Sequence, residues 1–203
     1  MYKVQRGIIL LLLLMMSFVF QSCRGEMPSD SVQSKLHNKL VRLKNYEVDA
    51  LITFLKDTEA NKLEMKQTVE IGGKYKLTLN APEHLKGYIT YFDGKELSQY
   101  SPITKTSVLC KGNEVRNQLL LSSFIHNYSN TDNIKADRNT LDGKACMTFE
   151  VPIPGSYKYM AAEKVWFDEE KLNPIKMEIY DLEGKVMIQL DFSQFKYNTE
   201  MKF

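Results

Sequence analysis

Histidine and cysteine are scarce in this chain, with three of each among 203 residues. The imidazoles of His37, His84 and His126 show no His-x-x-x-His or Cys-x-x-Cys spacing, so no zinc site is predicted. The sequence also lacks a Gly-x-Ser-x-Gly elbow, a phosphate-binding glycine loop and a dinucleotide fingerprint. These absences exclude the hydrolase and nucleotide-binding classes that such motifs mark, and we expect no cofactor or metal.

Two candidates for chemistry remain, and neither carries a complete set of groups. Cys110 and His126 can be imagined as a thiol and its base, but no third residue is available to orient the imidazole. His126 instead falls in the last turn of a predicted helix, which favours a capping role. The acidic run Asp168-Glu169-Glu170 is either a carboxylate cluster or a solvated hairpin connection, and its place before Asn173-Pro174 favours the connection. No catalytic residue is predicted.

The chain also lacks a net charge of either sign once its N-terminal segment is set aside. Lys3 and Arg6 account for the formal charge of +2, and without them basic and acidic residues are equal in number at 25 each. Nucleic-acid binding depends on clustered Lys and Arg that neutralise phosphates, so no nucleic-acid partner is expected.

One long apolar run is present, and it ends at a cysteine. Lys3 and Arg6 precede an apolar stretch over residues 8–20, which leads through Gln21-Ser22 to Cys23. That order predicts a lipoprotein signal peptide over residues 1–22 and acylation of Cys23, although Phe20 and Gln21 depart from the usual lead-in. The alternatives are a cleaved signal without lipid and a membrane-spanning anchor, for which the run is short. Lipidation predicts an exported protein on the outer face of a bacterial membrane.

The chain after Cys23 divides into a short linker and one domain. Residues 23–34 are polar and without periodicity, which predicts a flexible tether. Residues 35–203 have the length and apolar content of a single domain. Within it, Cys110 and Cys146 form an even pair that an exported location allows to be a disulfide, although two buried free thiols are favoured.

Period-two alternation of apolar residues dominates this domain and predicts half-buried antiparallel strands. It covers residues 48–54, 63–71, 75–79, 145–151, 157–167, 175–179 and 186–192. Tight turns are predicted at Gly72-Gly73, Asp93-Gly94, Asp142-Gly143 and Glu183-Gly184. The strands therefore form a long meander with one apolar face.

Two segments have helical periodicity instead. Leu36, Leu40 and Leu43 follow Ser34, a plausible N-cap, and predict a first helix with His37 on its polar side. The second helix is expected to begin at an Asn113 cap and to continue to Tyr128. We therefore predict an α+β fold in which a curved antiparallel sheet, or incomplete β-barrel, carries helices on its concave face. Three interpretations of the apolar face remain open. It is the core of the domain, an open hollow that holds an acyl chain, or an edge that receives a strand from a partner.

The C-terminal strands resemble those of the LolA-like lipoprotein-carrier superfamily. The residues that carry the resemblance are Val165-Trp166-Phe167-Asp168, the segment from Asn173 to Asp181, Gly184-Lys185, Phe192, and Phe195-Lys196-Tyr197-Asn198. The resemblance implies an incomplete antiparallel barrel closed by helices. A tether at Cys23 would prevent the shuttling expected of a soluble carrier.

Within that superfamily the chain is most similar to the clostridial spore-germination lipoproteins. This resemblance implies a noncatalytic partner of a CwlD-like cell-wall N-acetylmuramoyl-L-alanine amidase, acting in muramic-δ-lactam formation in the spore cortex. It also implies a homodimer formed by strand exchange. The alternatives are a lipid or lipoprotein carrier, or envelope sensor, that uses the apolar face, and an enzyme in its own right. The partner-binding residues are unknown at this stage.

Overall fold

The fold is built on one antiparallel sheet of eleven strands. The computed structural model describes residues 31–55, 60–110, 117–155, 157–201 and 203. Within them the strand order is β6-β5-β4-β3-β2-β1-β11-β10-β9-β8-β7. The strands are β1 (Asn45–Leu55), β2 (Ala60–Glu70), β3 (Tyr75–Ala81), β4 (Ile89–Phe92), β5 (Leu97–Ser101), β6 (Thr106–Cys110), β7 (Lys135–Leu141), β8 (Lys144–Pro152), β9 (Ala162–Asp168), β10 (Pro174–Tyr180) and β11 (Val186–Tyr197).

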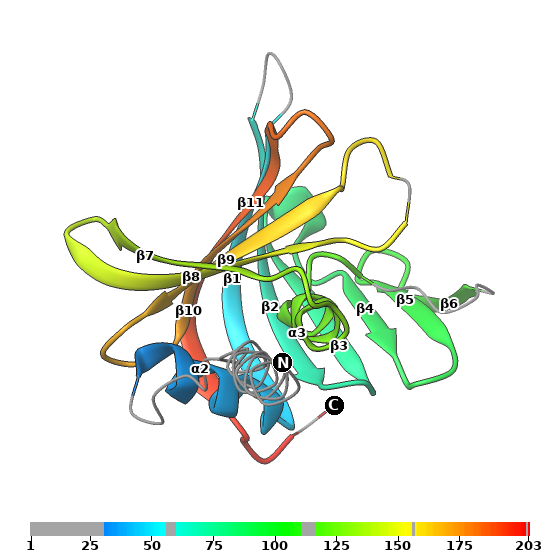
Figure 1. The fold of residues 1–203 in the computed structure, drawn as a ribbon. Helices are drawn as coiled ribbons and strands as arrows, with labels where there is room; N and C mark the ends of the chain where they lie inside the picture. Colours follow the sequence, from blue (N-terminus) through cyan, green and yellow to red (C-terminus); the bar gives the residue numbers. More distant parts are fainter. Residues whose placement is uncertain (1–30, 56–59, 111–116, 156, 202) are drawn as a thin grey trace, which may run out of the picture.

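Two meanders make up this sheet, and their longest strands join them. β1 to β6 pair in chain order, and so do β7 to β11. The two halves meet where β1 and β11 pair antiparallel, from Tyr46 opposite Tyr197 to Phe54 opposite Ile188. The sheet curves, and β6 and β7 remain as its two edges (Figure 1). The predicted curved, antiparallel and unclosed sheet is therefore confirmed.

The predicted glycine turns connect the strands as expected. Asp142 and Gly143 both have positive φ, of 50° and 78°, between the paired residues Leu141 and Lys144. Two consecutive residues in this conformation form the two-residue hairpin loop whose twist matches that of the strands. The other three predicted turns also lie between consecutive paired strands.

Some strand predictions need correction. The alternation over residues 157–167 predicts one strand, but β9 begins at Ala162, because residues 157–161 form a turn in which the Met160 N–H bonds to the Tyr157 carbonyl. The period-two pattern did not identify β4, β5, β6 or β7. Their exposed and half-buried positions alternate too weakly for the pattern to mark them.

In the described ranges, two helices lie on one face of the sheet (Figure 1). The first, α2 (Val32–Val41), begins three residues earlier than predicted, because the side chain of Ser31 accepts a hydrogen bond from the Ser34 N–H at 3.1 Å. Ser34 is thus inside the helix and Ser31 is the cap, so the last residues of the predicted tether are helical. None of the helices in the described part of the chain has the length and hydropathy that a membrane crossing requires.

The second helix is shorter than predicted. It is α3 (Leu121–Ser129), whereas the expected Asn113 cap lies outside the described residues. Residues 117–120 form a turn instead of a helix. The Asn117 side-chain oxygen accepts a hydrogen bond from the Leu119 N–H. The backbone carbonyl of Asn117 accepts both the Leu120 N–H and the Ser123 hydroxyl. These three bonds close the turn and start the helix at Leu121.

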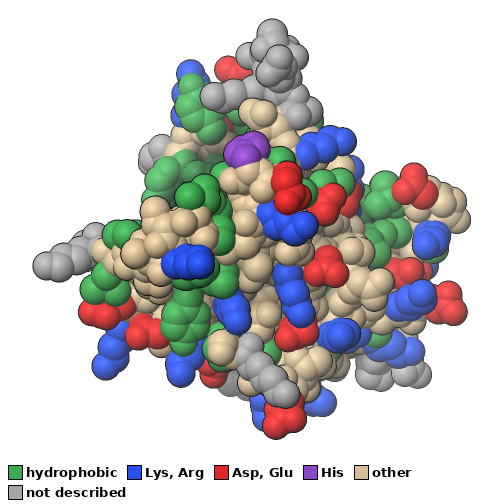
Figure 2. All heavy atoms as spheres, turned by 180° about the vertical axis from the view of Figure 1, so that it is seen from behind, with side chains coloured by type: hydrophobic (Ala, Val, Ile, Leu, Met, Phe, Trp, Pro, Cys, Tyr) green, Lys and Arg blue, Asp and Glu red, His purple; other side chains and the backbone are tan. Residues whose placement is uncertain are grey.

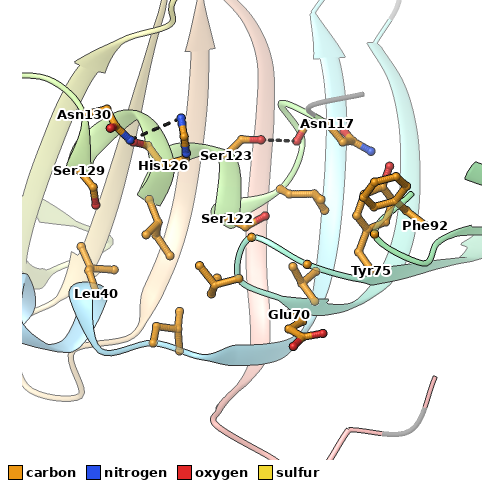
Figure 3. A pocket seen from close by; sticks show the side chains of 18 of the residues that line it. Leu40, Glu70, Tyr75, Phe92, Asn117, Ser122, Ser123, His126, Ser129 and Asn130 are labelled. Carbon is orange, nitrogen blue, oxygen red and sulfur yellow. Dashed lines mark hydrogen bonds between the residues drawn. The ribbon is translucent and has the colours of Figure 1, made fainter. Parts of the chain in front are cut away.

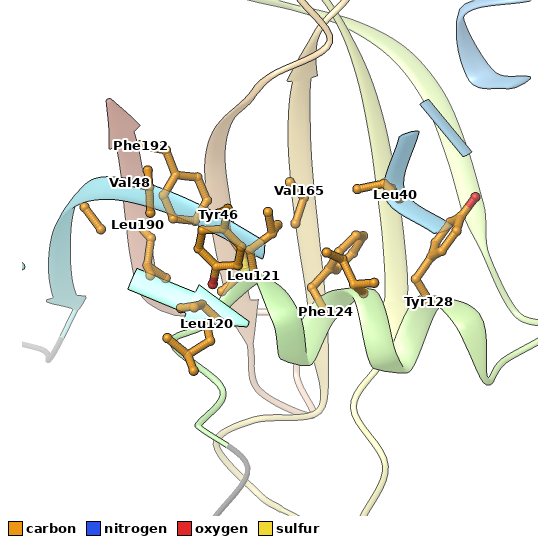
Figure 4. Packing of buried hydrophobic residues seen from close by; sticks show 14 of the residues in the cluster. Leu40, Tyr46, Val48, Leu120, Leu121, Phe124, Tyr128, Val165, Leu190 and Phe192 are labelled. Atoms are coloured by element: carbon orange, nitrogen blue, oxygen red, sulfur yellow. The ribbon is translucent and has the colours of Figure 1, made fainter. Parts of the chain in front are cut away.

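The core lies between the helices and the face of the sheet that they contact (Figure 4). Phe124 on α3 is fully buried and lies against Tyr128 and Phe167, with ring centroids 5.9 and 6.4 Å away. Phe149 on β8 extends this aromatic cluster, 5.3 Å from Tyr128 and 5.9 Å from Phe167. Leu36 and Leu40 bring α2 into the same cluster of buried residues. On the opposite side, acidic and basic side chains are interspersed (Figure 2).

Candidate functional site: a groove beside helix α3

A groove of about 490 Å³ runs along α3 (Figure 3). One wall is α3 itself, and the other walls are the end of α2, the β2–β3 turn and the hairpin between β4 and β5. Both turns are glycine-containing connections predicted from the sequence. The groove therefore lies where one meander, both helices and the turn before α3 meet, and its volume is within the range of small-molecule pockets.

The groove has an apolar lining and an uncharged polar rim. Its apolar side chains are Leu40, Val41, Leu43, Val69, Ile71, Tyr75, Phe92, Leu120 and Ile125. Asn117, Ser122, Ser123, Ser129 and Asn130 supply hydroxyl and amide groups from the turn before α3 and from α3 itself and its end. Among the described residues, Glu70 is the single carboxylate in the lining and His126 the single imidazole. This combination favours an apolar ligand or segment with few charges.

Buried polar contacts hold the α3 wall against the sheet. Gln67 on β2 is fully buried and donates a hydrogen bond to the Leu119 carbonyl at 3.1 Å. Tyr46 donates to the Gln67 amide oxygen at 3.4 Å, and burial raises the pKa of its phenol well above the ordinary value. Sequence analysis missed Gln67, although it stands in the alternating pattern of β2 among strand residues that face the core.

The three histidines lie on different elements and form no common site. His37 is exposed on α2, as expected for its polar side, and its Nδ1 lies 2.9 Å from the Tyr128 hydroxyl. His84 is exposed in a short 3-10 turn (Glu83–Leu85). His126 lines the groove, but the predicted capping role is filled by Asn130, whose Nδ2 donates to the His126 carbonyl at 2.7 Å. The Asn130 side chain lies one turn after His126 and so reaches the His126 carbonyl. The imidazole of His126 does not bond to that carbonyl.

The cysteines lie on well-separated strands. Cys110 is half-buried at the end of the edge strand β6, and Cys146 is fully buried on β8, next to the other edge strand. Both thiols are free, and burial raises the pKa of Cys146. No interaction joins Cys110 to His126 among the described residues. Cys23 and the predicted signal peptide lie outside those residues.

The acidic run over residues 168–170 is a turn, as the favoured interpretation expected. The Asp168 side chain accepts the backbone N–H groups of Glu170 and Lys171 at 2.9 and 2.7 Å. Glu169 pairs with Arg138 on the edge strand β7 at 3.2 Å. No group of three metal-ligating side chains occurs in the described part of the chain.

We expect Asp168→Ala to lower the free energy of unfolding by about 1–2 kcal/mol, because two turn N–H groups lose their acceptor. Urea unfolding of the variant measures this change. Glu170→Ala is the matched control, since its side chain is exposed and only its backbone takes part in the turn. Equal destabilisation by both substitutions would contradict the assigned role.

A buried carboxyl group beneath α3 is the most unusual polar feature. Glu163 on β9 is fully buried, and its Oε1 accepts a hydrogen bond from Asn127 Nδ2 at 2.7 Å. The remaining oxygens of this pair, Glu163 Oε2 and Asn127 Oδ1, are buried and have no hydrogen-bond partner among the described residues. Burial raises the pKa of Glu163 to about 7, and the bond from Asn127 opposes the rise. The alternation of β9 had already placed Glu163 among the inward positions.

The two edges of the sheet differ in character. β6 carries no charged side chain, and Val108 and Leu109 are 62% and 52% exposed. The opposite edge, β7, includes Lys135, Asp137 and Arg138, of which Lys135 pairs with Glu150 at 2.7 Å. Charges on an edge strand oppose pairing with another chain, and an uncharged edge with exposed apolar residues permits it. The β6 edge is therefore the better candidate for strand addition.

A curved, unclosed antiparallel sheet that carries two helices and a lateral groove defines the fold class of this chain. The chain belongs to the sporulation protein YdcC-like family, whose model matches residues 3–202. This membership confirms the predicted relationship to sporulation. No curated protein sequence matches the chain.

Solved structures agree with the fold. An uncharacterized conserved protein from Thermus thermophilus is 12% identical, with a TM-score of 0.53, and the match covers 84% of this chain and 90% of that one. A second match is to the structure of the CwlD amidase from Clostridioides difficile in complex with the GerS lipoprotein. Its identity is 22% and its TM-score 0.52, over 86% of this chain and 99% of that one. The predicted resemblance to a GerS-like protein is confirmed at the level of the fold.

Proposed function

We propose that the chain is a noncatalytic lipoprotein that binds and activates a cell-wall N-acetylmuramoyl-L-alanine amidase of the CwlD type. It is acylated at Cys23 and held on the outer face of a membrane in the spore or forespore envelope. There it supports muramic-δ-lactam formation in the cortex and, through it, germination. The observation that carries the proposal is the similarity to GerS, which was solved in complex with CwlD, over 86% of the chain. Membership of a sporulation family supports it.

The geometry supports a binding role in two ways. The acidic run considered for catalysis has structural partners, because Asp168 binds turn N–H groups and Glu169 pairs with Arg138. The fold also presents a surface that fits an extended segment of a partner, since β6 is an uncharged edge. Strand addition supplies affinity through backbone hydrogen bonds and specificity through alternate side chains. The same edge could pair with a second copy, which would form a homodimer.

Reconstitution with a sporulation amidase tests the proposal. We expect the mature chain to copurify with the amidase and to raise its activity on cortex peptidoglycan at least tenfold, read as muramic-δ-lactam after muropeptide digestion. An amidase that is equally active alone would falsify the proposal. Sedimentation of the mature chain alone tests the homodimer separately.

Matched edge variants locate the contact. We expect Leu109→Lys on β6 to weaken amidase binding at least tenfold, because a buried cation would face an uncharged strand interface. Thr140→Lys places the same charge on an exposed position of the opposite edge and should leave binding unchanged. Isothermal titration with the purified amidase compares the two. A larger loss with Thr140→Lys would move the contact to β7.

A second function is favoured by one observation, the groove of about 490 Å³ with its apolar lining. Its residues suit an acyl chain, which would make the protein a lipid or lipoprotein carrier or an envelope sensor. Native mass spectrometry of protein from sporulating cells would then show a bound acyl species. Replacing Ile125 with Trp, to fill the groove, should remove that species while leaving an amidase complex intact.

A further inference from the structure

The first described segment of the chain carries an uncompensated positive charge. Residues 31–46 include Lys35, Lys39, Arg42 and Lys44, and no acidic residue occurs among them. We refer to these four cations as the basic strip. The whole chain has a formal charge of only +2, so the strip is a local excess that the rest of the sequence offsets elsewhere.

Lys35 and Lys39 lie on α2, Arg42 is its C-cap, and Lys44 follows in the connection to β1. Lys35, Lys39 and Arg42 are spaced at i, i+4 and i+7, which places them along one side of a helix. Leu36 and Leu40 are buried on the adjoining side and anchor the helix to the core. Val41, at the end of α2, is 58% exposed on the side of the helix that borders the groove. A helix with a cationic side and an exposed apolar residue suits a lipid surface.

Three of the four cations are free to meet a partner. Lys35, Arg42 and Lys44 are exposed. Lys39 is half-buried, because its ammonium lies 3.7 Å from the centroid of the Tyr197 ring and donates to the Leu172 carbonyl at 3.1 Å. No carboxylate forms an ion pair with any of the four in the part of the chain that the structure describes.

Acidic groups near the strip are few and have cations beside them. Glu70 lines the groove together with Val41, and Lys74 lies in the same β2–β3 turn. Glu170 and Lys171 are exposed neighbours in the turn whose carbonyls accept the bonds from Lys39. These pairs cancel approximately, which leaves the field of the strip positive.

The position of α2 in the chain directs the strip toward a membrane. Ser31 caps the helix, and Cys23 lies only eight residues earlier. Those residues can extend to about 27 Å at most. If Cys23 is acylated, α2 is the folded element that the anchor keeps nearest to the bilayer.

We propose that the basic strip binds the headgroups of anionic phospholipids, so that α2 faces the membrane to which the chain is anchored. This proposal rests on the proposed acylation of Cys23. Clustered Lys and Arg residues add electrostatic attraction to anionic lipids beside a covalent lipid anchor. Contact through α2 fixes the orientation of the domain and leaves the β6 edge available to a partner.

The mature chain with Cys23→Ser cannot be acylated, so its binding to vesicles measures the contribution of the basic strip alone. We expect this variant to sediment with vesicles of equal phosphatidylglycerol and phosphatidylcholine, and not with vesicles of phosphatidylcholine alone. Raising NaCl from about 50 to about 500 mM should release it, since exposed charges are screened. Lys35→Gln, Arg42→Gln and Lys44→Gln combined should weaken binding by about fivefold per cation, or on the order of 100-fold.

The control removes three exposed lysines from hairpins elsewhere, with Lys95→Gln, Lys105→Gln and Lys144→Gln combined. It changes the net charge equally and should retain nearly all binding. Equal losses with both variants, or equal binding to both vesicle types, would overturn the proposal. Binding to soluble polyphosphate without binding to vesicles would also overturn it. The assay contains neither amidase nor lipid anchor, so its failure leaves the amidase proposal standing.

Discussion

Replacing Phe124 with alanine should lower the free energy of unfolding by about 3–5 kcal/mol, which is a large part of the stability of an ordinary domain. Phe124 is fully buried on α3, and its ring is packed between Tyr128 of the same helix and Phe167 of β9. The substitution removes a fully buried aromatic contact between α3 and the sheet and leaves a cavity. Urea unfolding followed by circular dichroism measures the change.

The matched control is Val108→Ala on β6, where the side chain is 62% exposed. Truncating it removes little buried area, so the free energy of unfolding should change by less than about 0.5 kcal/mol. If Phe124→Ala were no more destabilising than this control, α3 would not be an integral part of the core.

The second large effect concerns the charge state of Glu163. Its pKa is raised to about 7 in the folded protein by burial, whereas an exposed glutamate in the unfolded chain titrates near 4.5. The contribution of protonated Glu163 to the free energy of unfolding is fully present below pH 4.5. It is lost as the pH rises through the folded-state pKa of about 7. The free energy of unfolding should fall by up to about 3 kcal/mol across that window.

Glu163→Gln should remove this dependence on pH. The glutamine amide is neutral at every pH, and its NH₂ group can donate to Asn127 Oδ1, the oxygen that has no partner among the described residues. The variant should therefore be more stable than the parent at about pH 8 and nearly equal to it at about pH 4.5. Urea unfolding at several pH values gives the comparison.

Glu183→Gln in an exposed hairpin provides the control and should change the pH profile little. A parent protein whose stability is flat between about pH 4.5 and about pH 8, with the same profile in Glu163→Gln, would show that the carboxyl group is hydrated in solution. Asn127 is on α3 and Glu163 is on β9. The hydrogen bond between them therefore also holds this wall of the groove against the sheet.

Much of the sheet could be predicted because apolar and polar residues alternate along a strand that is buried on one face. β1, β2, β3, β8, β10 and β11 were found in this way, as were the four glycine turns between paired strands. β4 to β7 were not found, because strands near an edge are exposed on both faces or half-buried throughout and so lose the alternation. The pairing of β1 with β11 needed the structure, since strand order depends on contacts between distant residues.

The groove was harder to predict than the strands. Its apolar lining residues look like core residues in the sequence, and Ser122, Ser129 and Asn130 look like ordinary helix surface. Only the packing of α3 against two hairpins makes them one site. Glu163 is different, because a carboxylate at an inward position of a strand is visible in the pattern once each face is assigned.

The pairing of β1 with β11 also has a consequence for synthesis. Tyr46 lies opposite Tyr197, so the central part of the sheet joins the beginning of the domain to its last strand. Loop closure over such a separation is slow, and the central pairing cannot form before the C-terminal strand is available. The first meander can therefore form on a partly synthesised chain, whereas the two halves of the sheet can join only when almost the last residues have been made.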